Sequence, residues 1–239
     1  MESLSIDHHK ILFKKSRRAK RFRLQLDSAG QFILTAPLLT PKWVAHLFLK
    51  KHVGWIEKQV KKVDTQKVLR PSFHYRTGDT FYYFGEPVTL TIKPSDRKRP
   101  TIKIRGNEML ITLYRHITEA EGLNAVKKTI KKFYREKAEE VIHDRLQFFN
   151  EHYGFHYNRV TLRDQKSRWG SCSRLKNLNF NWRLIMAPIE IIDYVVAHEL
   201  CHLKEMNHSS RYWALVTQAI PDHKERRKWL RENHYLLTI

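Results

Sequence analysis

The sequence predicts an α+β fold, with a β-rich half over residues 1–115 and a helical half over residues 116–239. Three observations predict it. Short segments of alternating polarity fill the first half, an apolar period of three to four residues begins at Thr118, and a buried helix near residue 198 carries closely spaced histidines. Strands followed by helices are typical of α+β proteins. The halves form either two small domains or one continuous domain.

The first third of the chain predicts a hairpin and one helix. Residues 22–26 and 32–35 alternate in polarity on either side of Ser28-Ala29-Gly30, a pattern typical of a hairpin. An apolar stripe then predicts a helix that Thr40 caps. The stripe consists of Val44, Leu47, Phe48, Trp55, Ile56, Val60 and Val63. Residues 64–72 are largely polar and predict a connector.

Strands resume near residue 81 and give way to a long helix at Thr118. Two more hairpins are expected, because turn residues separate each pair of apolar segments. The expected strands are residues 81–84, 88–92, 101–104 and 109–113. Thr118 and Glu121 have the spacing of a capping box, and the helical period that follows ends near Gly154.

The last third predicts two strands and three helices. Residues 159–162 and 178–184 have the composition of strands. Pro188 precedes an apolar helix, Ser209 can cap a short one, and Pro221-Asp222 opens a final basic helix. The apolar helix is therefore expected to pack between a small sheet and other helices.

Composition excludes several classes of protein. No apolar run is long enough to cross a bilayer, and residues 1–10 lack the apolar stretch of a signal peptide. Two cysteines cannot form a disulfide framework, so we expect a cytoplasmic protein without a membrane partner. Lys and Arg outnumber Asp and Glu by 45 to 24, and the formal charge of +21 attracts polyanions such as nucleic acid or phosphorylated molecules.

The segment His198-Glu199-Leu200-Cys201-His202 has the spacing of a zinc site. Two histidines one turn apart on a helix point about 40° from each other, so both rings reach one small cation. Glu199 points about 100° from His198, which suits a general base that faces a water at the metal. His208 reaches the same ion only if the chain turns back near Met206-Asn207, where asparagine tolerates the left-handed conformation of such a turn.

A chance match is the alternative, because the chain has 14 histidines. The apolar surroundings argue against it, since unpaired imidazoles and a carboxylate are costly in a buried helix. The apolar neighbours are Ile189, Ile191, Ile192, Tyr194, Val195, Val196, Leu200 and Leu203. We therefore expect a metal site.

Four stretches resemble the YgjP-like metallohydrolases, which are relatives of the SprT-type zinc proteases. They are residues 166–172 (KSRWGSC), 179–184, 194–203 and 207–213. The resemblance covers most of residues 75–233 and implies a zincin-like catalytic half, in which the HExxH helix packs on a small sheet. It also implies zinc bound by His198, His202 and His208, with Glu199 as the catalytic carboxylate.

Other residues of these stretches are candidates with structural alternatives. Arg168 and Ser171 are candidate substrate contacts, although the tryptophan and glycine between them favour a core and a bend. Tyr212 is a candidate hydrogen-bond donor to an oxyanion, although packing beside a tryptophan is favoured. Glu205 replaces the glycine of metzincins, which favours the YgjP-like family. It is disfavoured as a ligand because an imidazole at His208 suits zinc.

The leading functional prediction is a zinc-dependent hydrolase of the metallopeptidase type, acting on peptides or proteins. One alternative is a metal-dependent nucleoside triphosphate pyrophosphohydrolase, or a hydrolase of another phosphorylated small molecule. That enzyme needs Lys or Arg converging at the metal, whereas a peptidase needs a groove beside a sheet edge. The other alternative is a nucleic-acid-binding protein, which rests on charge alone.

Overall fold

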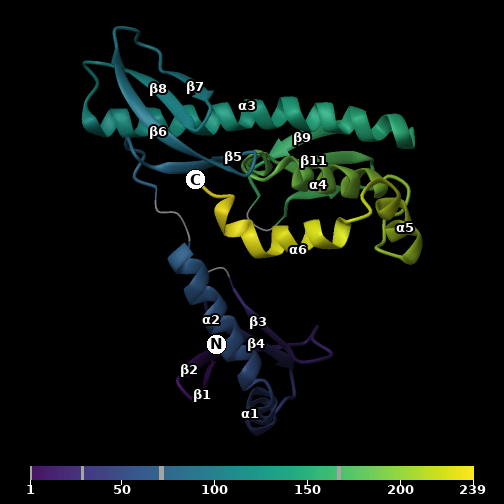
Figure 1. The fold of residues 1–239 in the computed structure, drawn as a ribbon. Helices are drawn as coiled ribbons and strands as arrows, with labels where there is room; N and C mark the ends of the chain where they lie inside the picture. Colours follow the sequence, from purple (N-terminus) through teal and green to yellow (C-terminus); the bar gives the residue numbers. More distant parts are fainter. Residues whose placement is uncertain (1, 28–29, 70–72, 166–167) are drawn as a thin grey trace. The chain divides into compact units, whose positions relative to one another are not determined.

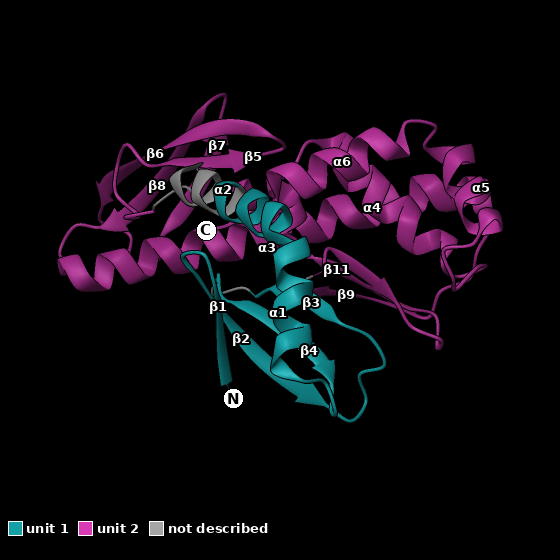
Figure 2. Cartoon of the chain, turned by 90° about the horizontal axis from the view of Figure 1, so that it is seen from below, with its two compact units in different colours: residues 1–70 teal, residues 71–239 magenta. Residues whose placement is uncertain are grey.

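The computed structural model describes residues 2–27, 30–69, 73–165 and 168–239. It divides into two compact units, residues 1–70 and residues 71–239, each with its own apolar core (Figure 2). Helices and sheets occur in both, which confirms the α+β class (Figure 1). None of the helices in these described ranges has the length and apolar character that a bilayer span requires.

The first unit is a four-stranded sheet with two helices. The sheet order is β1-β2-β4-β3, with β2 and β4 parallel. The strands are β1 (Glu2–Ile6), β2 (His9–Ser16), β3 (Arg23–Leu26) and β4 (Phe32–Pro37). The expected pairing of β3 with β4 is confirmed, whereas β1 and β2 were not predicted. One sheet face packs against Ala45, Leu49 and Ile56 of the helices.

The helical segment of this unit differs from the prediction in three ways. It consists of two helices, α1 (Lys42–Lys51) and α2 (Val53–Leu69). They separate at His52, whose ring Nδ1 lies 2.7 Å from the Phe48 carbonyl of the preceding turn. The N-cap is Pro41 and has no side-chain bond, so Thr40 was wrongly expected to cap. Helix α2 also continues into the expected connector, of which residues 70–72 lie outside the described residues.

The second unit begins with a four-stranded sheet that confirms both expected hairpins. The sheet order is β5-β6-β8-β7, with antiparallel pairs β5–β6 and β7–β8. The strands are β5 (Thr80–Tyr83), β6 (Glu86–Ser95), β7 (Thr101–Arg105) and β8 (Glu108–Tyr114). Gly106 turns the second hairpin at φ 53°, a conformation that glycine adopts at little cost.

Helix α3 (Glu119–Tyr153) runs along this sheet and on towards the last third of the chain (Figure 1). Both bonds of the expected capping box between Thr118 and Glu121 are present, and Gly154 ends the helix in the left-handed conformation. One buried side chain recurs every fourth residue and packs into the core of the unit. These residues are Val126, Ile130, Tyr134, Ala138, Ile142 and Leu146.

The last third forms a three-stranded sheet and a group of short helices. The sheet order is β10-β11-β9, from β9 (Arg159–Arg163), β10 (Gly170–Cys172) and β11 (Asn177–Asn181). The helices are η1 (Trp182–Met186), α4 (Ile189–Cys201), α5 (Ser210–Ala219), α6 (His223–Asn233) and η2 (His234–Leu236). Strand β11 ends three residues earlier than expected, because the Asn181 side chain accepts the Arg183 N–H and caps η1.

The compact units divide at residues 70 and 71, whereas the sequence placed a boundary at residues 115 and 116. Side chains of β5, β6 and β8 share one apolar core with α3 and α4, so these strands are part of the same compact unit as the histidine helix. Whether residues 1–115 and 116–239 are independent domains is a separate question, so the boundary at residue 115 stays a prediction.

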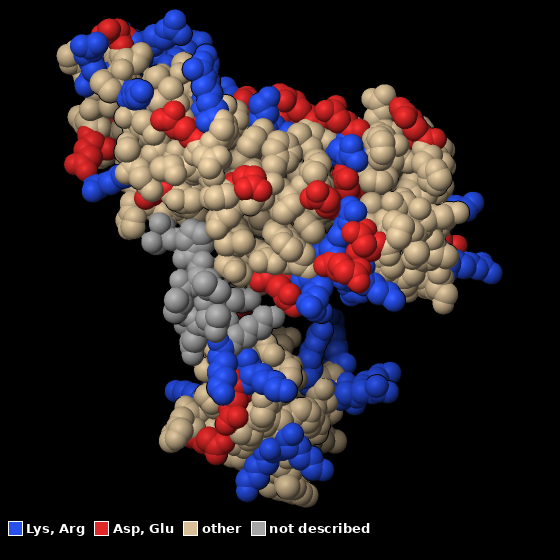
Figure 3. Space-filling view, in the orientation of Figure 1, with Lys and Arg blue, Asp and Glu red and all other residues tan. Residues whose placement is uncertain are grey.

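Basic residues are denser in the first unit. Residues 1–70 contain 16 Lys and Arg against 5 Asp and Glu. Figure 3 shows blue side chains on both units, with red ones more frequent on the face of the second. The first unit therefore has the higher density of positive charge.

Candidate metal centre

Helix α4 and its C-cap residue carry two of the three histidines, His198 and His202. The helix lies between strand β11 and helix α6 in Figures 1 and 2. Its apolar residues Ile191, Val195 and Val196 are buried in the core of the second unit. Arg145 of α3 forms a two-bond ion pair with Asp193, at 2.5 and 3.0 Å. Burial raises the pKa of Asp193, while the Arg145 charge opposes this shift. The helix is thus held by apolar packing and by one half-buried ion pair.

Three histidines converge at the C-terminal end of α4. The ligand nitrogens of His198, His202 and His208 all lie within 4.8 Å of one another. The Nε2 atoms of His198 and His208 are 3.3 Å apart. Two of the rings come from α4 and its cap residue, and the third comes from the loop before α5. Among the described residues this is the group that could hold a metal ion.

The chain reverses after α4 and so brings His208 back to the helix. The N–H groups of Lys204 and Glu205 both bond the Cys201 carbonyl, and Ser209 then caps α5 as expected. Asn207 is not among the residues with positive φ, so the expected left-handed turn at this position was wrong. The chain instead changes direction through the hydrogen bonds of Lys204 and Glu205 to Cys201 at the end of α4.

Two of the three histidines, His198 and His202, are in the neutral state that binds a metal. Burial lowers the pKa of His198 to about 3 and also lowers the pKa of His202, so both rings are neutral at pH 7. The Nδ1 of His202 lies 3.0 Å from the backbone carbonyl of Glu205, which leaves Nε2 for an ion. Glu205 therefore contacts the site through its backbone, and its carboxylate is outside the ligating group. The three imidazoles fit a zinc ion.

Glu199 is a buried carboxylate on the same helix. It is 4% exposed, and its Oε2 has no hydrogen-bond partner among the described residues. Burial raises its pKa to about 8, and the charge of Arg168 opposes this shift. An unpartnered carboxylate in such a position is costly unless a cation or a substrate proton lies beside it.

The RWGSC segment lies against α4, as strand β10 and the residues before it. Arg168 is exposed and is the charge that acts on Glu199. Ser171 accepts a hydrogen bond at 3.3 Å from Asn179 of the neighbouring strand. The Tyr212 hydroxyl donates to the His198 carbonyl at 3.1 Å, and its ring stacks on His202. These bonds give Ser171 and Tyr212 structural partners, while their contact with a substrate stays a prediction.

Sequence reasoning missed two residues that shape this site. Asn181 is 2% exposed, and its Nδ2 donates to the carbonyls of Gln165 and Arg168 at 2.7 and 3.2 Å. Gly170 faces Glu199 directly. The available sequence signals were the glycine of RWGSC and an asparagine at the end of an apolar strand. Neither signal predicts which distant residue it contacts.

We predict that Asn181→Ala destabilises the protein by about 1–3 kcal/mol, because it leaves the carbonyls of Gln165 and Arg168 without their buried donor. Urea denaturation measures this loss. Asn158→Ala is the matched control, since that side chain also donates to a carbonyl, of Leu175, but in an exposed place. Equal losses in the two variants would contradict a special role of Asn181.

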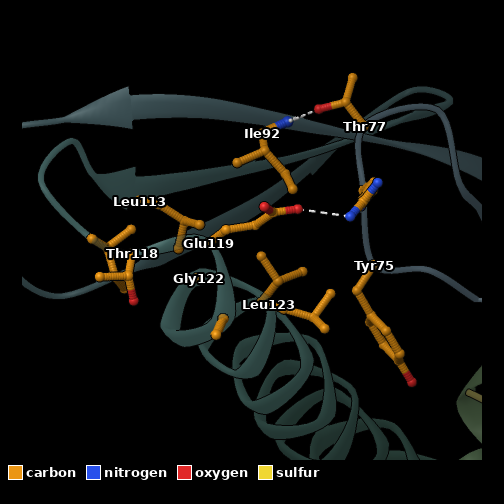
Figure 4. A pocket seen from close by; sticks show the side chains of 12 residues that line it. Tyr75, Thr77, Ile92, Leu113, Thr118, Glu119, Gly122 and Leu123 are labelled. Carbon is orange, nitrogen blue, oxygen red and sulfur yellow. Dashed lines mark hydrogen bonds and ion pairs between the residues drawn. The ribbon is translucent and has the colours of Figure 1, made fainter.

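A separate pocket lies at the start of α3, and its lining contains none of the three histidines (Figure 4). Its volume is about 750 Å³, and Ile92, Leu113 and Leu123 contribute to its apolar lining. Arg76 and Glu119 form an ion pair of 2.7 Å at its side, and both side chains are exposed. None of the lining residues is a member of the histidine group, so we place the chemistry at α4.

Comparison with known proteins identifies the class and the family. A family model described as YgjP-like, metallopeptidase domain, matches residues 20–233. The chain is thus a metal-dependent hydrolase with a metallopeptidase domain. It belongs to the YgjP-like family. The crystal structure of the metallopeptidase zymogen of Pyrococcus abyssi abylysin matches 38% of this chain and 93% of its own, with 24% identity and a TM-score of 0.35. No curated protein matches the chain.

Proposed function

We propose that this metallopeptidase is a zinc-dependent enzyme in which His198, His202 and His208 hold the ion and Glu199 is the catalytic carboxylate. The observation that carries the proposal is that three imidazoles and a buried carboxylate lie together at the C-terminal end of α4. Three imidazole nitrogens lie within 4.8 Å of one another, and a buried carboxylate follows the first of them in sequence. Three imidazoles leave a fourth position on zinc for water or substrate, as catalytic sites do.

In peptide hydrolysis, the histidines would hold the zinc ion and Glu199 would transfer the proton. A bound zinc ion supplies a Lewis acid that polarises the scissile carbonyl and lowers the pKa of water towards about 7. Glu199 accepts a proton from the attacking water at a carboxylate oxygen and then passes it to the leaving amine. Among the described residues its Oε2 has no hydrogen-bond partner, so this oxygen is available to the attacking water.

The edge of the small sheet offers a place for an extended peptide. In the order β10-β11-β9, strand β10 is an edge strand and pairs with β11 alone among the described strands. A peptide adds to such an edge through its main chain. Because Gly170 of β10 faces Glu199, a peptide on this strand passes close to the carboxylate. Arg168 and Ser171 are then placed to contact the peptide side chains.

Hydrolysis of phosphorylated molecules and nucleic-acid binding stay predictions based on charge. The family match supports neither. Among the described residues, the charge of Arg168 acts on Glu199 and the charge of Arg227 acts on His198. The guanidinium of Arg227 lies 5.4 Å from the Trp213 ring centre, where stacking engages it.

The proposal is tested by adding and removing zinc. The zinc-loaded protein is incubated with a peptide library and with a panel of nucleotides, before and after chelation. We expect peptide cleavage that falls at least about 100-fold on chelation and returns with one zinc ion per chain, because the ion supplies the electrophile. Cleavage that persists without metal, or phosphate release in place of peptide cleavage, would contradict the proposal.

A further inference from the structure

Gly170 lies where any side chain would collide with the catalytic carboxylate. A Cβ placed on Gly170 would lie 2.6 Å from Cγ of Glu199 and 2.8 Å from its Cδ, and closer still to Oε1. Carbon atoms that do not share a bond pack at about 3.5–4.0 Å. Glu199 therefore keeps its observed position only because residue 170 has no side chain.

Backbone conformation does not account for this glycine. The glycines with positive φ are Gly30, Gly78, Gly85, Gly106 and Gly154. Gly170 is not among them, so an L-residue could adopt its backbone angles. What requires glycine at this position is the approach of the strand to the carboxylate.

The backbones on both sides of this contact are held in place. The Trp169 carbonyl accepts the Asn181 N–H at 2.8 Å, and Gly170 pairs in register with Phe180, which is fully buried. Glu199 lies on a helix that is packed in the core. A side chain at residue 170 must therefore displace the Glu199 side chain rather than the strand.

We propose that Gly170 is a positioning residue, whose bare backbone fixes where the Glu199 carboxylate lies. The inference rests on the proposed role of Glu199. Since no described residue bonds Oε2 of Glu199, packing against Gly170 takes the place of a hydrogen bond in orienting the group. A shift of about 1 Å in a catalytic group costs on the order of 100-fold in rate.

The kinetic test is Gly170→Ala in the zinc-loaded enzyme. We expect kcat for a cleaved peptide to fall about 100-fold, with KM changed less than about threefold and one zinc ion still bound per chain. Gly122→Ala is the matched control. A Cβ there would lie 3.6 Å from Ile117 and 3.7 Å from Leu113, so activity should stay unchanged. An unchanged kcat in Gly170→Ala would overturn the proposal.

A stability measurement tests the same contact without activity. Gly170→Ala should lower Tm by about 3–6 °C in the wild-type background and by much less in Glu199→Ala, where the added methyl group occupies the vacated space. Equal losses in both backgrounds would overturn the proposed contact. Full activity of Glu199→Gln would instead refute the role of Glu199, so the two failures are distinguishable.

Discussion

Glu199→Gln should lower kcat for peptide cleavage about 1,000-fold while one zinc ion per chain stays bound. The amide has nearly the same shape as the carboxylate but cannot accept the proton of the attacking water, and a positioned general base contributes about 10²–10⁴-fold. Glu199 is 4% exposed, so bulk water does not replace it readily. Steady-state kinetics and metal analysis of the purified variant measure the two quantities.

The matched control is Glu190→Gln, which removes an exposed carboxylate from the first turn of the same helix. It should leave both kcat and zinc content unchanged. Loss of zinc from Glu199→Gln would show that the carboxylate is a ligand rather than a base. Retained cleavage in a pure preparation would refute the assignment of the base.

The parts of the fold that sequence predicted are those with local signals. The hairpin of β7 and β8 has a glycine at its turn, and α3 has a capping box at one end and a glycine at the other. Strands β1 and β2 were missed, since β1 pairs with β2 and β2 pairs with β4, and no glycine marks the turn between β1 and β2. Strand β10 is three residues long, too short to show a period.

In the candidate site, too, the sequence predicts the features that have local signals and misses a contact between distant residues. The spacing of His198 and His202 on a helix brings two ligands together, and the turn after α4 adds His208. The approach of Gly170 to Glu199 is different, because it joins residues far apart in the chain. No periodicity encodes that contact. The roles of these residues in catalysis stay predictions until they are measured.

His202→Ala should weaken zinc binding at least about 100-fold and abolish peptide cleavage. The loss exceeds that of replacing a residue that only orients a metal ligand, which typically costs about 10–100-fold in affinity. His202 is also the ring whose Nδ1 is held by the Glu205 carbonyl, so no neighbouring histidine replaces it in the same orientation. Competition with a chromophoric chelator measures the Kd for zinc.

The control for this ligand is His156→Ala, which removes an exposed imidazole outside the group of three. Zinc should raise Tm of the wild-type protein and of His156→Ala equally, since an ion that binds the folded state stabilises it by mass action. It should leave Tm of His202→Ala almost unchanged at the same zinc concentration. If His202→Ala instead binds zinc with unchanged Kd, the ion lies elsewhere, and the histidines at the end of α4 are not its ligands.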